Sequence, residues 1–103
     1  MTANKFPYLF QFFGAYFHQD WDLEAQEDEG IIRNYLQESS LTAVKQTITE
    51  ITQLLAMNFS EKRLKKFLIH ELGCFYNPTS KGISYQDWLL WIENFIKKET
   101  SIS

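Results

Sequence analysis

The residues near the N-terminus that are best suited to chemistry are His18 and Asp20, which are two positions apart. A His-x-Asp pair can bind a metal ion or transfer a proton, because imidazole and carboxylate groups do both. Two side chains are too few for a metal site, which takes at least three protein ligands. We therefore expect His18 to end a helix or to bond within the following loop, and we expect no metal site here.

A second candidate lies in the C-terminal half. His70 and Glu71 match the start of the His-Glu-x-x-His zinc motif, but Cys74 occupies the position of the second His and no third ligand follows. Cys74 lies between Gly73 and Phe75 without an evident base beside it, so a small buried thiol is expected. The four glycines of the chain form no phosphate-binding cluster. These patterns favour a protein that is not an enzyme and that needs no cofactor.

Charge is distributed unevenly along the chain, whose formal net charge is −3. Six of its 13 carboxylates fall within residues 20–29, a segment without Lys or Arg that we call the acidic strip. A basic cluster is formed by Lys62, Arg63, Lys65 and Lys66. This pattern lacks the extended positive face that nucleic-acid binding requires. It favours a cationic protein partner, although the acidic strip could equally begin a helix or keep the protein soluble.

Length and composition set the broad class. The 103 residues, 45% hydrophobic and 17% aromatic, predict one folded domain over residues 1–103. The single cysteine excludes an internal disulfide and suits a reducing compartment. No apolar stretch approaches the roughly 18 residues of a membrane span. Pro7, Gln11 and Gly14 interrupt the aromatic N-terminal segment, so we expect no signal peptide. The expected location is the cytoplasm, without membrane contact.

The spacing of apolar residues predicts helices throughout, and no sustained alternation predicts a strand. A first helix is expected over 7–19, with Phe10 and Phe13 on one apolar face and Leu9 and Phe12 on a neighbouring face. Because apolar residues cover most of its circumference, this helix should be central to the core. A second helix is expected over 26–38. Its inner face should consist of Ile31, Ile32, Tyr35 and Leu36.

Three further helices are expected over 41–57, 60–72 and 84–98. Ser60 and Ser84 are suited to the N-cap position, because a serine hydroxyl can accept a hydrogen bond from a first-turn amide. Gly73 is placed to end the fourth helix, and Glu50 is expected on a face of the third helix away from the core. The apolar face of the third helix should contain Leu41, Val44, Ile48, Ile51 and Leu55. Together these helices predict an all-α fold, a compact single-domain bundle of about five helices.

Residues 6–24, FPYLFQFFGAYFHQDWDLE, strongly resemble the opening of a family of immunity proteins from bacterial contact-dependent growth inhibition systems. A weaker likeness covers residues 72–78, 82–84 and 88–89. The core of the first likeness is the pattern G-x-Y-F-H-Q-D-W, formed by Gly14, Tyr16, Phe17, His18, Gln19, Asp20 and Trp21.

Members of that family are cytoplasmic antidotes. The resemblance implies that this chain binds the C-terminal toxin domain of a cognate CdiA-type surface protein, as a one-to-one complex, and blocks it. Many such toxins are nucleases with cationic clefts, which an acidic surface can fill. On this hypothesis the toxin-binding residues are Asp20, Asp22, Glu24, Glu27, Asp28 and Glu29. A shared motif is poorly suited to select one toxin. We therefore expect a mainly structural role for Gly14, Tyr16, Phe17, His18, Gln19 and Trp21.

Two alternatives are open at this point. A helical adaptor or regulatory module that binds another basic protein would have the same charge pattern, and it would be isolated with that protein in fixed stoichiometry. A small hydrolase or metal enzyme would contain bound metal, or it would lose activity on His18→Ala or His70→Ala without unfolding.

Overall fold

The computed structural model describes residues 6–18 and 27–101, which form helices and no strand. The five α-helices confirm the predicted all-α class. Among the described residues, none of the helices has the length and apolar character needed to cross a membrane. In chain order the elements are α1 (Pro7–Tyr16), α2 (Asp28–Glu38), α3 (Leu41–Ala56), α4 (Glu61–Lys66), the π-helical turn η3 (Phe67–Glu71), the 3-10 helix η4 (Pro78–Lys81) and α5 (Tyr85–Thr100).

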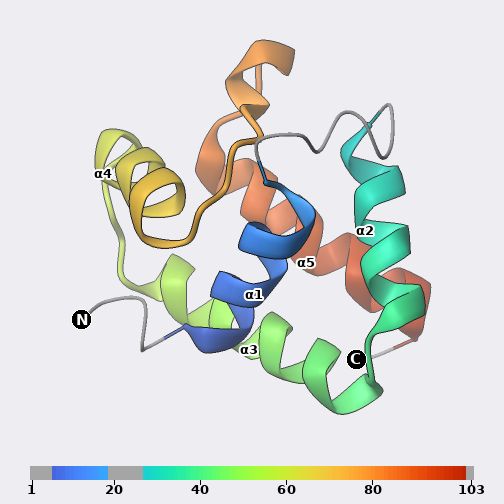
Figure 1. Cartoon of the computed structure of the whole chain (residues 1–103). Coiled ribbons are helices and arrows are strands. Elements are labelled where there is room, and N and C mark those ends of the chain that lie inside the picture. Colours follow the sequence, from blue (N-terminus) through green and yellow to red (C-terminus); the bar gives the residue numbers. More distant parts are fainter. Residues whose placement is uncertain (1–5, 19–26, 102–103) are drawn as a thin grey trace.

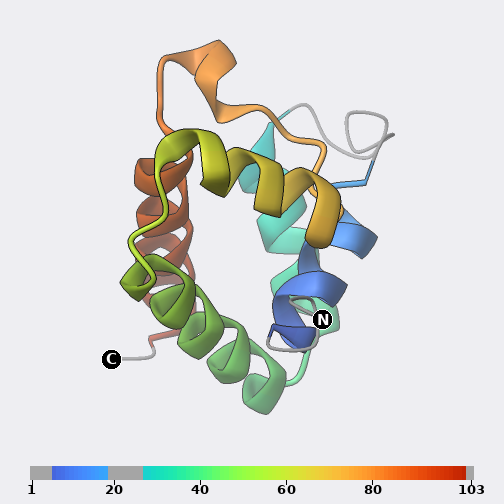
Figure 2. The same cartoon turned by 90° about the vertical axis from the view of Figure 1, so that its left-hand side faces the viewer.

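In the view of Figure 1, helix α1 lies between α4 and α2. It packs against α2 and α3, while α5 packs against α3 and α4. Figure 2 shows α5 on the opposite side of the molecule from α1, with α3 along one edge and α4 along the other. Side chains from all five helices therefore meet in one core, to which α1 contributes its buried face.

The aromatic residues of α1 form the centre of that core, as predicted. Leu9, Phe12 and Phe13 are fully buried. The ring centroid of Phe13 lies 5.8 Å from that of Trp88 of α5. Phe10 was predicted to share the core face and does not, because its side chain is 51% exposed. Tyr8 and Gln11 are exposed beside it, so α1 packs on the core through one face, and the prediction that the core surrounds this helix is wrong.

Helix ends follow the local signals closely. Ser60 and Ser84 accept hydrogen bonds from the amides of Arg63 and Asp87, which confirms both predicted N-caps. Gly73 has a φ of +71° and ends the segment that begins with α4, also as predicted. Helix α1 ends earlier than expected, at Tyr16, and α5 continues to Thr100.

Two helices begin at a carboxylate that belongs to another helix. Glu50 of α3, predicted to face away from the core, is buried, and its carboxylate accepts hydrogen bonds from the amides of Tyr8 at 3.2 Å and Leu9 at 2.9 Å. Glu61 of α4 likewise accepts from the amides of Tyr85 and Gln86. Each carboxylate satisfies amides that have no partner within their own helix and complements the positive end of its dipole.

The apolar face predicted for α3 is confirmed in its middle and wrong at its start. Val44, Ile48 and Ile51 are buried and Leu55 is half-buried. Leu41 is 55% exposed, because it is the first residue of the helix and lies beyond the core.

Candidate functional site

The described part of the acidic strip is Glu27, Asp28 and Glu29, at the start of α2. The Glu27 side chain is 67% exposed. Asp28 is buried; its Oδ2 accepts a hydrogen bond from the indole Nε1 of Trp88 at 3.0 Å, and its Oδ1 accepts one from the Glu29 amide at 3.1 Å. The strip therefore combines one carboxylate that is bonded within the fold with two that lie at the surface.

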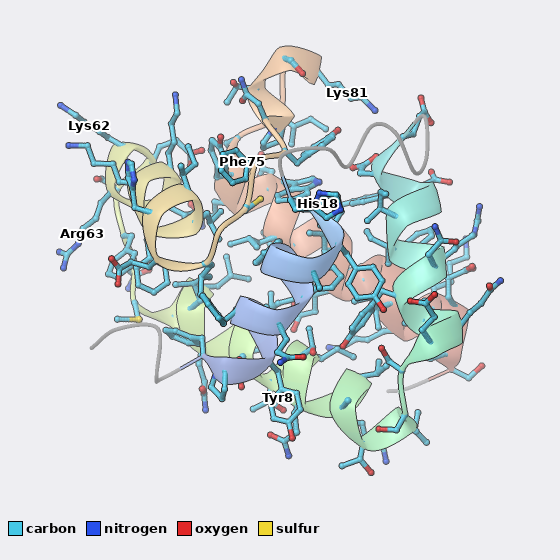
Figure 3. The ribbon with its side chains drawn as sticks, viewed as in Figure 1. Tyr8, His18, Lys62, Arg63, Phe75 and Lys81 are labelled. Atoms are coloured by element: carbon cyan, nitrogen blue, oxygen red, sulfur yellow. The ribbon has the colours of Figure 1, made fainter. Side chains whose placement is uncertain are left out.

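Two cations lie beside these carboxylates. The Nζ atom of Lys81 in η4 is 3.8 Å from Oε1 of Glu27 and 3.7 Å from Oδ1 of Asp28. Figure 3 shows Lys81 at the outer end of the molecule. Nη1 of Arg33 is 3.6 Å from Oε2 of Glu29. Surface ion pairs of this kind contribute about 0–1 kcal/mol. A cationic partner can therefore compete for Glu27 and Glu29 at little cost.

Asp20, Asp22 and Glu24 of the acidic strip lie outside the described residues, as do Gln19 and Trp21 of the G-x-Y-F-H-Q-D-W pattern. Their predicted roles stay predictions.

Phe17 joins this pattern to the aromatic core. Its ring is fully buried and lies edge-on to that of Trp88, at a centroid distance of 5.4 Å. Tyr76 stacks on the same indole at 4.8 Å. The Phe17 carbonyl accepts a hydrogen bond from the Phe75 amide at 2.8 Å, where the chain leaves α1. The indole that holds Asp28 thus also packs against the end of α1.

The remaining described residues of the pattern lie at the same end of α1. A Cβ atom added to Gly73 would lie 3.6 Å from the Cα atom of Gly14, so the backbones of α1 and of the turn after η3 approach closely here. The Tyr16 hydroxyl donates a hydrogen bond to Oε1 of Glu38 at 2.5 Å. His18 is half-buried at the exit from α1 (Figure 3). The sequence predicted a mainly structural role for Tyr16 and gave no signal for Glu38.

A pocket of about 570 Å³ opens between α1, α2 and α3. Its deep part is formed by the buried rings of Phe12 and Tyr35, and its mouth by the exposed Tyr8 and Glu38 and the half-buried Tyr16. The complete lining is Pro7, Tyr8, Gln11, Phe12, Tyr16, Tyr35, Glu38, Ser39 and Ala43. Periodicity could not reveal this pocket, because it predicts the faces of each helix and not how two helices meet.

The electrostatics of this pocket are simple. Glu38 is the one ionisable carboxylate among its described lining residues, which include no Lys, Arg or His. Burial raises the pKa of the Tyr35 hydroxyl, and hydrogen bonds to Thr47 and Ser39 partly oppose that shift. The Tyr35 and Thr47 hydroxyl oxygens are 2.7 Å apart. Tyr35 is therefore a neutral phenol at neutral pH, and the pocket carries the negative charge of Glu38.

Cys74 and His70 are candidate catalytic residues that lie within the described part of the chain. Cys74 is fully buried, and burial raises the pKa of its thiol to about 12, although a hydrogen bond to the Tyr76 carbonyl partly opposes this. The thiolate that a nucleophile requires is therefore scarce at neutral pH. His70 is exposed at the end of η3. Within residues 6–18 and 27–101, no three His, Cys, Asp or Glu side chains are grouped as metal ligands.

The basic cluster lies on α4, with its side chains exposed. Figure 3 shows Lys62 and Arg63 pointing outward from the side of the molecule that is farthest from α2. The guanidinium carbon of Arg63 lies 4.5 Å from the ring centroid of Phe59, a cation–π contact. The cluster is thus well separated from the described carboxylates at the start of α2.

Comparison with known proteins gives a family match and a structural match. A protein-family model described as CdiI immunity protein matches residues 5–96. A chain of the crystal structure titled CdiA-CT/CdiI complex from Y. kristensenii 33638 is similar, with a TM-score of 0.83 and 26% sequence identity. The alignment covers 89% of the present chain and 98% of that chain. A search of curated proteins gave no significant match.

Proposed function

Because this chain belongs to the CdiI immunity protein family, we propose that it binds the C-terminal toxin domain of its cognate CdiA-type protein and neutralises it. The observation that carries this proposal is the family match, which extends over nearly the whole chain. The similar chain from Y. kristensenii adds support, because its structure is titled as a CdiA-CT/CdiI complex.

The proposed mechanism is a one-to-one complex in the cytoplasm in which binding alone blocks the toxin. No catalytic step is required of this chain, and the high pKa of the buried Cys74 thiol supports a role without one. We propose that the toxin is a nuclease with a cationic cleft. Glu27 and Glu29 are the described carboxylates of the acidic strip that can reach such a cleft. Electrostatic attraction would also speed capture of the toxin.

Growth protection tests the proposal. The toxin domain encoded immediately upstream should be expressed in bacteria with and without this chain. We expect growth to stop with the toxin alone and to be restored when the chain is co-expressed. Killing at full strength in the presence of folded, soluble chain would contradict the proposed function.

Charge reversal tests the assigned surface. Glu27→Lys with Glu29→Lys should weaken toxin binding about tenfold or more, mainly through slower association, because both carboxylates attract the partner. Surface plasmon resonance measures the rates, and circular dichroism should show unchanged helicity. The matched control is Glu71→Lys with Glu99→Lys, which changes the net charge equally at exposed sites on η3 and α5. Equal affinities of the two double variants would move the interface away from the start of α2.

A further inference from the structure

We infer that the pocket between α1, α2 and α3 receives one cationic side chain, a Lys or Arg that projects from the toxin domain. This inference rests on the proposed function and adds a second contact surface to it. The observation behind this inference is a pocket lined by aromatic rings, with the Glu38 carboxylate as the one acidic group among its lining residues.

Aromatic side chains from α1 and α2 line the pocket and contact one another. Tyr16 and Tyr35 are almost perpendicular, at 81°, with centroids 5.3 Å apart. Phe12 meets Tyr35 edge-on at 4.6 Å. Tyr8 completes the mouth from the first turn of α1, and Figure 3 shows it at the α3 end of that helix. Aromatic faces that converge from several directions attract a cation through their negative quadrupole faces, and the attraction is stronger where water is excluded.

Glu38 supplies the charge complement. Its Oε1 is held by the Tyr16 hydroxyl at 2.5 Å, which fixes the carboxylate at the pocket mouth. No described Lys or Arg forms an ion pair with it, in contrast to Glu29 and Glu99, which both contact Arg33. A partner cation would therefore meet an oriented carboxylate without displacing an internal cation.

A second carboxylate lies behind the aromatic lining. Glu50 bonds the backbone amide of Tyr8 at 3.2 Å, at the start of the helix that forms one wall. Its negative charge adds to the attraction of the pocket for a cation and opposes an anionic ligand. The volume of about 570 Å³ is within the range of small-ligand sites and accommodates a long side chain.

Paired substitutions test the pocket in the complex. Glu38→Gln removes the charge and keeps the shape, while Tyr8→Ala removes one ring at the mouth. Each should raise the Kd for the toxin domain about tenfold or more, measured by titration calorimetry. The controls are Glu99→Gln, an exposed carboxylate with its own side-chain bond, and Phe10→Ala, an exposed ring of α1 outside the pocket lining. Both controls should stay within about twofold of the wild type.

The outcomes separate this inference from the proposed function. Absence of binding by the wild type would contradict the proposed function itself. Tight binding by the wild type, with Glu38→Gln and Tyr8→Ala equally tight, would overturn the pocket assignment and leave the proposed function in place.

A second readout is independent of the toxin. N-acetylarginine amide should shift the NMR ring signals of Tyr8, Tyr16 and Tyr35 in the wild type, and much less in Glu38→Gln. N-acetylcitrulline amide has nearly the same shape without the charge and should cause little shift. Equal shifts by both compounds would assign the pocket to a neutral ligand and overturn the inference. If the chain forms a dimer and Glu38→Gln dissociates that dimer, the pocket binds a second copy of the chain. That result would also overturn the inference.

Discussion

Neighbouring carboxylates of the acidic strip have different roles, and their difference is set by a residue far along the chain. Asp28 is buried because the indole of Trp88, 60 positions away, bonds its Oδ2. The Glu27 side chain is 67% exposed, and its carboxylate lies 3.8 Å from Nζ of Lys81 at the surface. The sequence predicted a carboxylate-rich helix start, but the burial of Asp28 depends on a tertiary contact that local pattern does not encode.

Asp28→Ala should lower the free energy of unfolding by about 1–3 kcal/mol, because it leaves the buried Trp88 Nε1 without an acceptor. Glu27→Ala removes the same charge from an exposed position and should change stability by less than about 0.5 kcal/mol. Urea denaturation measures both values. Equal losses for the two variants would contradict the internal role assigned to Asp28.

The buried thiol of Cys74 should make stability depend on pH in alkaline solution. Burial raises its pKa from 9.0 to about 12, so the unfolded chain releases this proton first as pH rises. The contribution of the protonated thiol to the free energy of unfolding is therefore fully present below about pH 9, and it is lost progressively toward pH 12. Between about pH 8 and pH 10.5, the unfolding free energy of the wild type should fall relative to that of Cys74→Ala, by on the order of 2 kcal/mol.

The comparison isolates the thiol, because other alkaline groups occur in both proteins. Burial also raises the pKa values of Tyr35 and Tyr76, and their contributions cancel in the difference between wild type and variant. Burial raises the pKa of Tyr85 too, and the charge of the Cys74 thiolate adds to that shift, so the difference includes this coupling to Tyr85. Chemical denaturation at the two pH values provides the measurement. If the difference in unfolding free energy between wild type and Cys74→Ala is the same at both pH values, the thiol has the same pKa in the folded and unfolded states. That result would contradict the prediction.

At the scale of the elements, helix starts show which parts of the fold could be predicted. The N-caps Ser60 and Ser84 could be predicted from the sequence, because the amide that each hydroxyl bonds is only three residues ahead. Glu50 and Glu61 were missed, since they bond amides 41 and 24 positions away at the starts of other helices. Local spacing predicts where a helix begins, but it does not predict which other helix supplies an acceptor there.

The close approach of α1 to the turn after η3 provides an element-scale prediction. Gly73→Ala should cost about 1–2 kcal/mol, because φ of +71° is strained for a residue with a Cβ atom. Gly14→Ala should leave stability unchanged or raise it by up to about 1 kcal/mol. Among the described residues its Cβ would meet the Leu72 carbonyl at an ordinary contact distance of 3.9 Å, and alanine favours the helix. Thermal unfolding of both variants tests this. A larger loss for Gly14→Ala would contradict the geometry at this crossing.

At the scale of the whole molecule, the helices keep the two candidate contact surfaces apart from the chain's basic cluster. The acidic strip and the α1–α2–α3 pocket both include residues of α2, whereas the basic cluster lies on α4. Helical periodicity predicted that α1 contributes buried aromatic rings to the core, but not that its opposite face is exposed. The pocket could not be predicted, because its lining combines Tyr8 and Tyr16 of one helix with Tyr35 and Glu38 of another.

Direct binding of a toxin domain is the central claim. It is tested most directly by calorimetric titration of the purified chain with the toxin domain encoded immediately upstream. We expect one-to-one stoichiometry, a Kd in the nanomolar range or below, typical of tight specific protein complexes, and loss of toxin activity at equivalence. Absence of heat and of any shared elution peak at micromolar concentrations, with both proteins folded, would contradict it.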